Sequence, residues 1–119
     1  MGKRAFGTAV AGAVTTLTVS AGAVSPDADK VNQFNIDTNA AFTINNPTNG
    51  VDAQILVFRI KNTHATTTFT VSYGTAFRFG SGVALADVNS IIAQKKWYVS
   101  CRYDAADSKW DVVGVSPGH

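Results

Sequence analysis

The stretch that decides the fold is Ala53-Gln-Ile-Leu-Val-Phe-Arg-Ile-Lys-Asn62, which has the highest density of large apolar residues in the chain. These residues are nearly continuous and many are β-branched or aromatic, whereas an amphipathic helix would place them every three or four positions. In a strand, alternate side chains point to opposite faces. The stretch therefore predicts a central strand with one apolar face and one face that begins apolar and becomes basic. The first face carries Gln54, Leu56, Phe58 and Ile60, and the second carries Ile55, Val57, Arg59 and Lys61.

Shorter segments with alternating apolar residues lie on both sides of this strand. Turn residues separate them, most clearly in Asn46-Pro-Thr-Asn-Gly50, because Pro fixes φ and Asn-Gly tolerates positive φ. The last two segments predict a β-hairpin with a loop of about five residues. Residues 21–30 predict a loop, and residues 85–93 fit either a helical turn or a loop. The other expected strands are residues 14–20, 31–37, 41–45, 67–73, 77–79, 97–103 and 109–116.

Short strands at intervals of about ten residues, with no convincing long helix, predict an all-β fold. We expect an antiparallel β-sandwich, jelly-roll-like, in a single domain over residues 14–119. Residues 1–13 are small and Gly-rich with a basic start, and they predict an extended N-terminal arm. A secretory signal is the alternative for this end, but Gly and Thr interrupt its apolar stretch. The residues expected in the core are Leu56, Phe58, Ile60, Trp97 and Trp110.

Composition argues against several classes of partner. The net charge is +2 and only 15 % of the residues are charged, so the broad basic surface of a nucleic-acid-binding protein is not expected. No stretch reaches the roughly 18 apolar residues of a membrane span, so no membrane partner is expected. The single cysteine, Cys101, excludes a disulfide within the chain.

Metal sites have weak support in the sequence. His64 and His119 are the only histidines, and neither has a partner at the spacing of a zinc site. Asp27 and Asp29, with Asn32, offer oxygens at a spacing that could begin a calcium loop, but the chain contains no Glu to complete one. A solvated Asx turn is the simpler interpretation of this segment. We expect no metal and no cofactor.

Catalytic residues are equally hard to assign. Asp104, Asp107 and Asp111 gather around the last turn, and paired carboxylates are the groups of a glycosidase. Asp is also favoured in hairpin loops for conformational reasons, which is the preferred interpretation here. The aromatic residues Trp97, Tyr98, Tyr103 and Trp110 could form a platform for sugars or bases, or could divide between the core and a subunit contact. We predict that the protein is not an enzyme.

The segment from about Asn45 to Val115 resembles a small β domain of tailed-phage virion proteins. The pattern begins with Asn46-Pro-Thr-Asn-Gly50 and the strand from Gln54 to Asn62. It continues with Thr70-Val-Ser-Tyr-Gly74, Ala76-Phe-Arg-Phe-Gly80 and Tyr103-Asp-Ala-Ala-Asp-Ser-Lys-Trp-Asp111, which leads into Val-Val-Gly-Val. Similar modules occur in phage tail fibres and in decoration or cement proteins that bind capsids. The resemblance supplies no catalytic residues.

The resemblance implies a capsid decoration protein, because the chain is nearly all one domain with an arm and has no long shaft. Such proteins resemble small trimers on the capsid exterior, so the expected partners are the major capsid protein and two further copies of the chain. The expected location is the virion, after synthesis in the host cytoplasm. The alternative is a tail-fibre or head-fibre module that recognises host-surface glycans. A small hydrolase, with a cleft at Asp104 and Asp107, is a third hypothesis.

Two sets of contact residues follow from these expectations. In the arm, Lys3, Arg4 and Phe6 are expected to contact the capsid or a neighbouring subunit, with Phe6 as the buried anchor. Ile55 and Tyr98 are expected at the subunit interface, because the central strand has more apolar surface than one core requires. We assign Tyr98 and Cys101 together to this second, partly apolar face.

Overall fold

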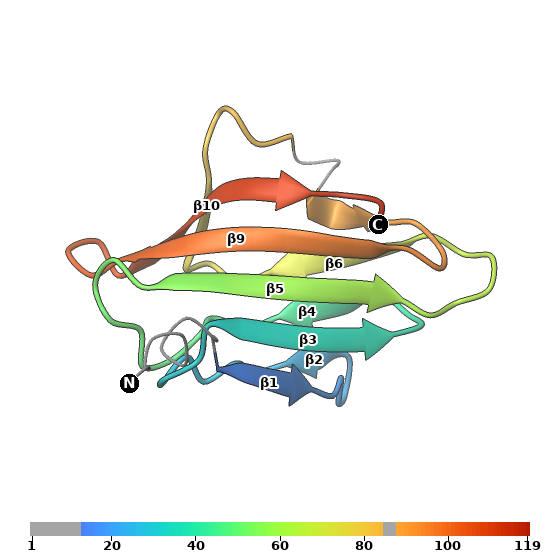
Figure 1. The fold of residues 1–119 in the computed structure, drawn as a ribbon, viewed down its shortest axis with the longest axis horizontal. Coiled ribbons are helices and arrows are strands. Elements are labelled where there is room, and N and C mark those ends of the chain that lie inside the picture. Colours follow the sequence, from blue (N-terminus) through green and yellow to red (C-terminus); the bar gives the residue numbers. More distant parts are fainter. Residues whose placement is uncertain (1–12, 85–87) are drawn as a thin grey trace, which may run out of the picture.

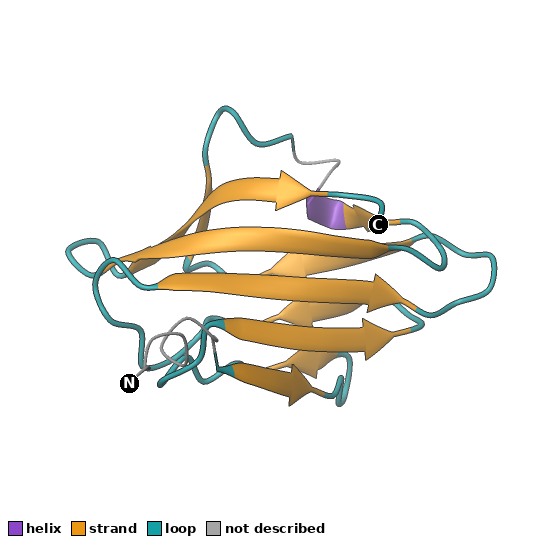
Figure 2. Cartoon of the chain, viewed as in Figure 1, coloured by secondary structure: helices purple, strands orange, loops and turns teal. Residues whose placement is uncertain are grey.

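The computed structural model describes residues 13–84 and 88–119, and almost all of its regular structure is β (Figure 2). A single helical turn includes Val88 and Asn89, directly before a two-residue strand. The all-β prediction is therefore confirmed. The strands are β1 (Val14–Leu17), β2 (Ala23–Val24), β3 (Gln33–Thr38), β4 (Phe42–Ile44), β5 (Ile55–Asn62), β6 (Phe69–Tyr73), β7 (Phe77–Phe79), β8 (Ser90–Ile91), β9 (Lys96–Asp104) and β10 (Lys109–Ser116).

The strands form two sheets that lie one behind the other (Figure 1). One sheet has six strands in the order β1-β3-β5-β9-β10-β7, and the other has four in the order β2-β4-β6-β8. The side chains between the sheets form one hydrophobic core. β5 lies in the interior of the larger sheet, as its apolar sequence predicts.

The chain changes sheets at every step from β1 to β9. As a result β1, β3 and β5 stack in parallel in the larger sheet, and β2, β4 and β6 stack in parallel in the smaller one. Parallel neighbours cannot be joined by a tight turn and need a long crossover. Here each crossover is a strand of the opposite sheet. The prediction of antiparallel pairing is therefore wrong for the pairs within these two stacks, and β7 also pairs with β10 in parallel. The pairs β5–β9, β6–β8 and β9–β10 are antiparallel.

Rows of buried side chains cross the larger sheet in register. Phe34 of β3 lies beside Phe58 of β5, which lies beside Val99 of β9. The rings of Phe34 and Phe58 stack with centroids 5.6 Å apart, and Phe77 meets Phe58 edge-on at 5.9 Å. All five residues predicted for the core are buried there: Leu56, Phe58, Ile60, Trp97 and Trp110.

Some local predictions are confirmed and others are wrong. The hairpin of β9 and β10 forms, with an antiparallel register that shifts at a bulge between Val112 and Gly114. Residues 21–30, predicted to be a loop, contain β2. This strand has only two residues, so it shows no periodicity in the sequence. The assignment of Cys101 to the outer face is wrong, because Cys101 has the same strand parity as Val99 and is fully buried.

One polar side chain, Asn62, is fully buried at the end of β5. Its amide nitrogen donates to the carbonyl oxygens of Thr67 and Ile91, each at 2.8 Å. Its carbonyl oxygen accepts from the backbone N–H of His64 at 2.9 Å. Because all these groups are paired, Asn62 joins the end of β5 to the next turn and to β8 without the penalty of an unsatisfied buried amide.

The core packing predicts the effect of a large truncation. Replacing Phe58 with Ala removes a ring that touches both Phe34 and Phe77, so the free energy of unfolding should fall by about 3–5 kcal/mol. Urea denaturation followed by tryptophan fluorescence measures this change. Val51→Ala is the control, because Val51 is 67 % exposed and its truncation should cost less than about 0.5 kcal/mol. Equal losses in the two variants would contradict the assigned core.

Candidate functional site

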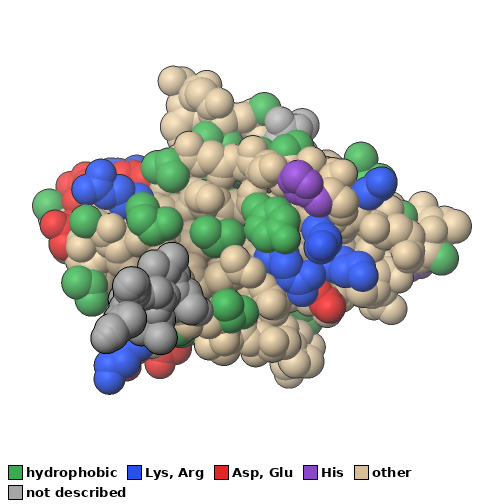
Figure 3. All heavy atoms as spheres, viewed as in Figure 1, with side chains coloured by type: hydrophobic (Ala, Val, Ile, Leu, Met, Phe, Trp, Pro, Cys, Tyr) green, Lys and Arg blue, Asp and Glu red, His purple; other side chains and the backbone are tan. Residues whose placement is uncertain are grey.

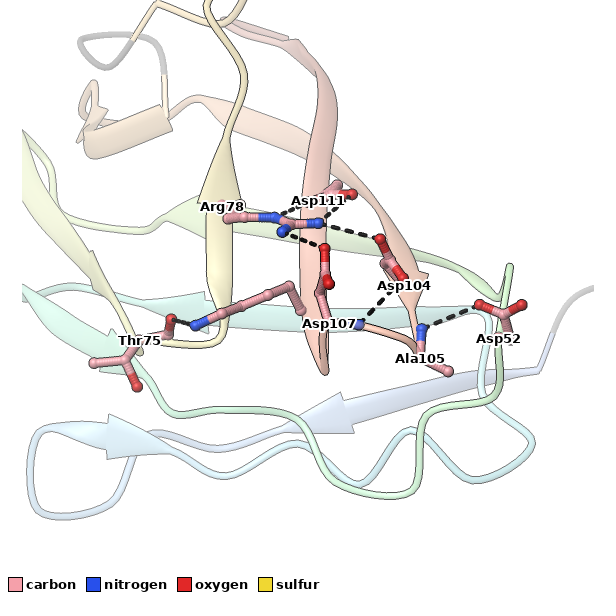
Figure 4. Close-up of polar contacts among 8 residues, drawn as sticks. Asp52, Thr75, Arg78, Asp104, Ala105, Asp107 and Asp111 are labelled. Atoms are coloured by element: carbon pink, nitrogen blue, oxygen red, sulfur yellow. Dashed lines mark hydrogen bonds and ion pairs between the residues drawn. The ribbon is translucent and has the colours of Figure 1, made fainter.

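An ion-pair cluster lies at the β9–β10 hairpin and comprises Arg78, Asp104, Asp107 and Asp111 (Figure 4). Arg78 is the middle residue of β7, where the flanking Phe77 and Phe79 turn toward the core and Arg78 points outward. The parallel register places Asp111 of β10 directly beside it. Asp104 ends β9 and Asp107 lies in the hairpin turn, so the turn brings both carboxylates to the same guanidinium.

The guanidinium of Arg78 binds all three carboxylates. It contacts Asp111 through two nitrogens, with Nε donating to Oδ1 at 2.6 Å and Nη2 donating to Oδ2 at 3.1 Å. Nη1 donates to Asp107 at 2.8 Å, and Nη2 reaches Asp104 at 3.3 Å. Two-nitrogen binding of one carboxylate fixes the plane of the guanidinium. Arg78 thereby joins β7, β10 and the hairpin turn.

The charge of Arg78 works against a role for Asp111 as a general acid. The hydrogen bonds from Arg78 hold the pKa of Asp111 below its usual range, and the bonds that Arg78 donates to Asp111 and Asp107 raise its own pKa further above the ordinary value. A glycosidase needs one carboxylic acid that stays protonated near neutral pH. Asp111 instead favours its ionised form beside the permanent cation of Arg78, which suits a structural ion-pair network.

An open hollow of about 270 Å³ adjoins the cluster. Asp52 borders it and accepts a hydrogen bond from the backbone N–H of Ala105 at 3.1 Å, which ties the turn before β5 to the hairpin turn. The volume of the hollow is at or below the lower end of the range for typical ligand pockets. The residues that line it are Asp52, Arg102, Tyr103, Asp104 and Asp111.

The second candidate site is the outer face of the six-stranded sheet, which Figure 3 shows from the front. We use this term for the side chains of β1, β3, β5, β9, β10 and β7 that point away from the core. Ile55 is 48 % exposed there and Tyr98 is half-buried, so both residues assigned to a subunit interface lie on one face. Val14, at 56 % exposure, lies on the same face at the start of β1.

The two ends of this face differ in charge. Basic side chains gather where β5 ends and β9 begins, and the cluster of Arg78 lies at the opposite end (Figure 3). At the basic end, Arg59 donates through Nη2 to Asp37 at 2.6 Å, while its buried Nε has no hydrogen-bond partner. Lys61 of β5 lies directly beside Lys96 of β9 in the sheet register.

The aromatic residues do not form a platform for a sugar or a base. Trp97 and Trp110 are buried, and the ring of Trp110 lies 4.7 Å from that of Tyr103. Tyr98 faces outward, where its ring meets His119 edge-on at 5.6 Å. The interpretation that divides the aromatic residues between the core and an outer surface therefore agrees with their positions.

The side chains of Asp27 and His64, two candidate metal ligands, accept hydrogen bonds from nearby groups. Asp27 accepts from the backbone N–H of Asp29 at 3.0 Å, which is an Asx turn, and from the side chain of Asn49 at 2.9 Å. These bonds, that of Asn49 first, lower the pKa of Asp27. His64 accepts through Nδ1 from the N–H groups of Thr66 and Thr67. No group of three metal-ligating side chains exists within residues 13–84 and 88–119.

Arg78 is the site residue that sequence reasoning missed. Its only local signal is a charged residue between two phenylalanines in a three-residue strand. The pairing of β7 with β10, some thirty residues later in the chain, has no sequence signature. The predicted arm residues Lys3, Arg4 and Phe6 lie outside the described part of the chain, as does the arm itself apart from Ala13.

No protein-family model, curated protein or solved structure matches the chain. In the part of the chain that the structure describes, no helix is long and apolar enough to cross a membrane.

The cluster predicts a pH-dependent contribution to stability. Because Arg78 lowers the pKa of folded Asp111 below the unfolded value of about 3.9, this stabilisation is complete above that value and is lost as the pH falls through the folded pKa. Arg78→Gln should lower the melting temperature at pH 7 and reduce the wild-type dependence on pH between about 5 and 2.

Lys109→Gln is the control for this experiment, because the Lys109 ammonium donates to the carbonyl oxygen of Thr75 at 3.0 Å and to no carboxylate. It should leave the acid dependence unchanged. Thermal unfolding by circular dichroism over this pH range measures both variants. An Arg78→Gln curve parallel to that of the wild type would show that the cluster does not stabilise the fold.

Proposed function

We propose that the protein is a non-enzymatic phage virion protein, a capsid decoration protein that binds the head exterior as a homotrimer and stabilises the shell. The phage assignment derives from the sequence resemblance. The structural observation in its favour is the outer face, a broad sheet surface that carries exposed Ile55 and half-buried Tyr98 while the neighbouring carboxylates are engaged by Arg78. Such a surface suits docking more than chemistry.

We also propose that the fold is a β-sandwich. Two sheets that share one core support a β-sandwich, related to jelly rolls by its double-sheet plan although its pairing is mixed. The N-terminal arm of residues 1–13 is proposed to contact the major capsid protein or a neighbouring subunit through Lys3, Arg4 and Phe6.

A fibre module that binds host-surface glycans is the second candidate. The hollow beside the hairpin favours it, because Asp52, Arg102 and Tyr103 offer the charged and aromatic groups that hold sugars. Its small volume and the burial of both tryptophans count against this role. Decoration therefore remains the function that we propose.

Native particles test the decoration role. Particles from which this protein has been removed should release their genome at lower temperature, or after milder osmotic shock, than intact particles. Re-adding the purified protein should restore the resistance, because binding would bridge neighbouring capsid subunits. Equal resistance of stripped and intact particles would contradict the function. If the protein were located only on the tail of the native particle, that result would favour the fibre module.

The interface is tested separately by a matched pair of variants. Ile55→Lys should split the trimer into folded monomers, because it places a positive charge in the proposed contact. Ile92→Lys is the control, since Ile92 is 51 % exposed against 48 % for Ile55 but lies beyond β8, in the connection to β9. Multi-angle light scattering gives the mass, and circular dichroism checks the fold. A monomeric wild type at micromolar concentration would contradict the trimer.

A further inference from the structure

The basic end of the outer face carries an excess of positive charge. Its sheet rows carry three cationic side chains, Arg59, Lys61 and Lys96, and one side-chain carboxylate, Asp37, which binds Arg59 and lies beside Lys61 in the register. Among these four side chains the positive charges exceed the negative ones by two. Lys61 and Lys96 are direct cross-strand neighbours, an arrangement that destabilises a sheet when nothing neutralises it.

The opposite end carries a matching excess of negative charge. Three carboxylates share the single guanidinium of Arg78, so two negative charges are unmatched in the cluster. Asp107 is the most exposed of the three, with 56 % of its side chain accessible. The nearby charges of Asp52 and Arg102 offset each other, and Lys109 reduces the excess without removing it.

The two ends are too far apart to neutralise each other. The row that holds Lys96 and the row that holds Arg102 are six residues apart along β9, which is roughly 20 Å of strand. This separation exceeds the Debye length of about 8 Å at physiological salt. Between them the face carries uncharged side chains, including Gln33, Val57 and Ser100, beside the backbone of Gly114, so a flat partner could approach closely.

We propose that the outer face binds a second copy of this chain, whose acidic end lies on the basic end of the first. The charge excesses are opposite in sign, and the carboxylate cluster would relieve the repulsion between Lys61 and Lys96. The molecule measures 48 × 32 × 29 Å, so its broad face can supply the roughly 800 Å² per partner that a stable interface needs.

This inference rests on the proposed function only in assuming that the protein assembles with itself. In a three-fold assembly the strands would run around the axis, so that the basic end of each copy meets the acidic end of the next. The contact is heterologous and closes into a ring. The inference thus adds a direction to the trimer, which its exposed apolar residues alone do not define.

Charge exchange tests the contact. Lys61→Glu places like charges together and should weaken self-association about tenfold or more, and Asp107→Lys should do the same from the other side. The double variant restores opposite charges at every contact and should recover most of the lost affinity. Lys30→Glu is the control, because Lys30 is an exposed lysine in the loop before β3, and it should change little.

Sedimentation equilibrium at low and high salt measures the association, with circular dichroism as the check on folding. Single variants that associate like the wild type would overturn the contact while leaving the trimer intact. A double variant as weak as either single variant would also overturn it. If Lys61→Glu abolished particle binding without changing self-association, the basic end would bind an acidic capsid surface or glycan instead.

Mixing the two single variants distinguishes the geometries. In a two-fold, face-to-face pair the mixture restores both contacts and should give a stable complex of two chains. That result would keep the contact and overturn the three-fold ring. Loss of capsid protection by stripped particles is independent of all these outcomes, so failure of the decoration role and failure of this contact are separable.

Discussion

The register between β3 and β5 is the constraint on which the rest of the structure depends. It places Phe34 beside Phe58 and Ile36 beside Ile60, so two rows of large side chains meet across parallel strands. A slip of one residue would turn both rows to solvent. Because the strands run in the same direction, the chain between them must return along another path, and it does so through β4 in the opposite sheet. The two-layer arrangement thus follows from one parallel pairing.

The sequence predicts the elements of this fold better than their order. Alternation of apolar residues identifies β5 and its buried face, and the turn at residues 46–50 and the final hairpin are placed correctly. The two-residue strands β2 and β8 are too short for any period to appear. Parallel pairing is missed because regular spacing of short strands is typical of antiparallel sandwiches, and spacing alone says nothing about which strands become neighbours.

The sequence likewise reveals some residues of the candidate sites and not others. Asp104, Asp107 and Asp111 are visible in the sequence because they surround one turn. Their counter-ion, Arg78, comes from a distant strand that only the tertiary pairing of β7 with β10 brings near. The outward position of Ile55 and Tyr98 follows from strand parity, and the error over Cys101 comes from assigning it the wrong parity. The charge difference between the two ends of the face depends on the register of five strands, β3, β5, β9, β10 and β7, which no local pattern contains.

The position of β9 and β10 has a consequence for how the protein is made. These strands are synthesised after β1 to β8, yet they occupy the interior of the larger sheet, between β5 and β7. Until they emerge from the ribosome, one edge of the most apolar strand is unpaired and β7 has no neighbour in its sheet. An exposed apolar edge of this kind favours association between nascent chains. The yield of folded protein should therefore depend on how quickly translation passes from Asn62 to Ser116.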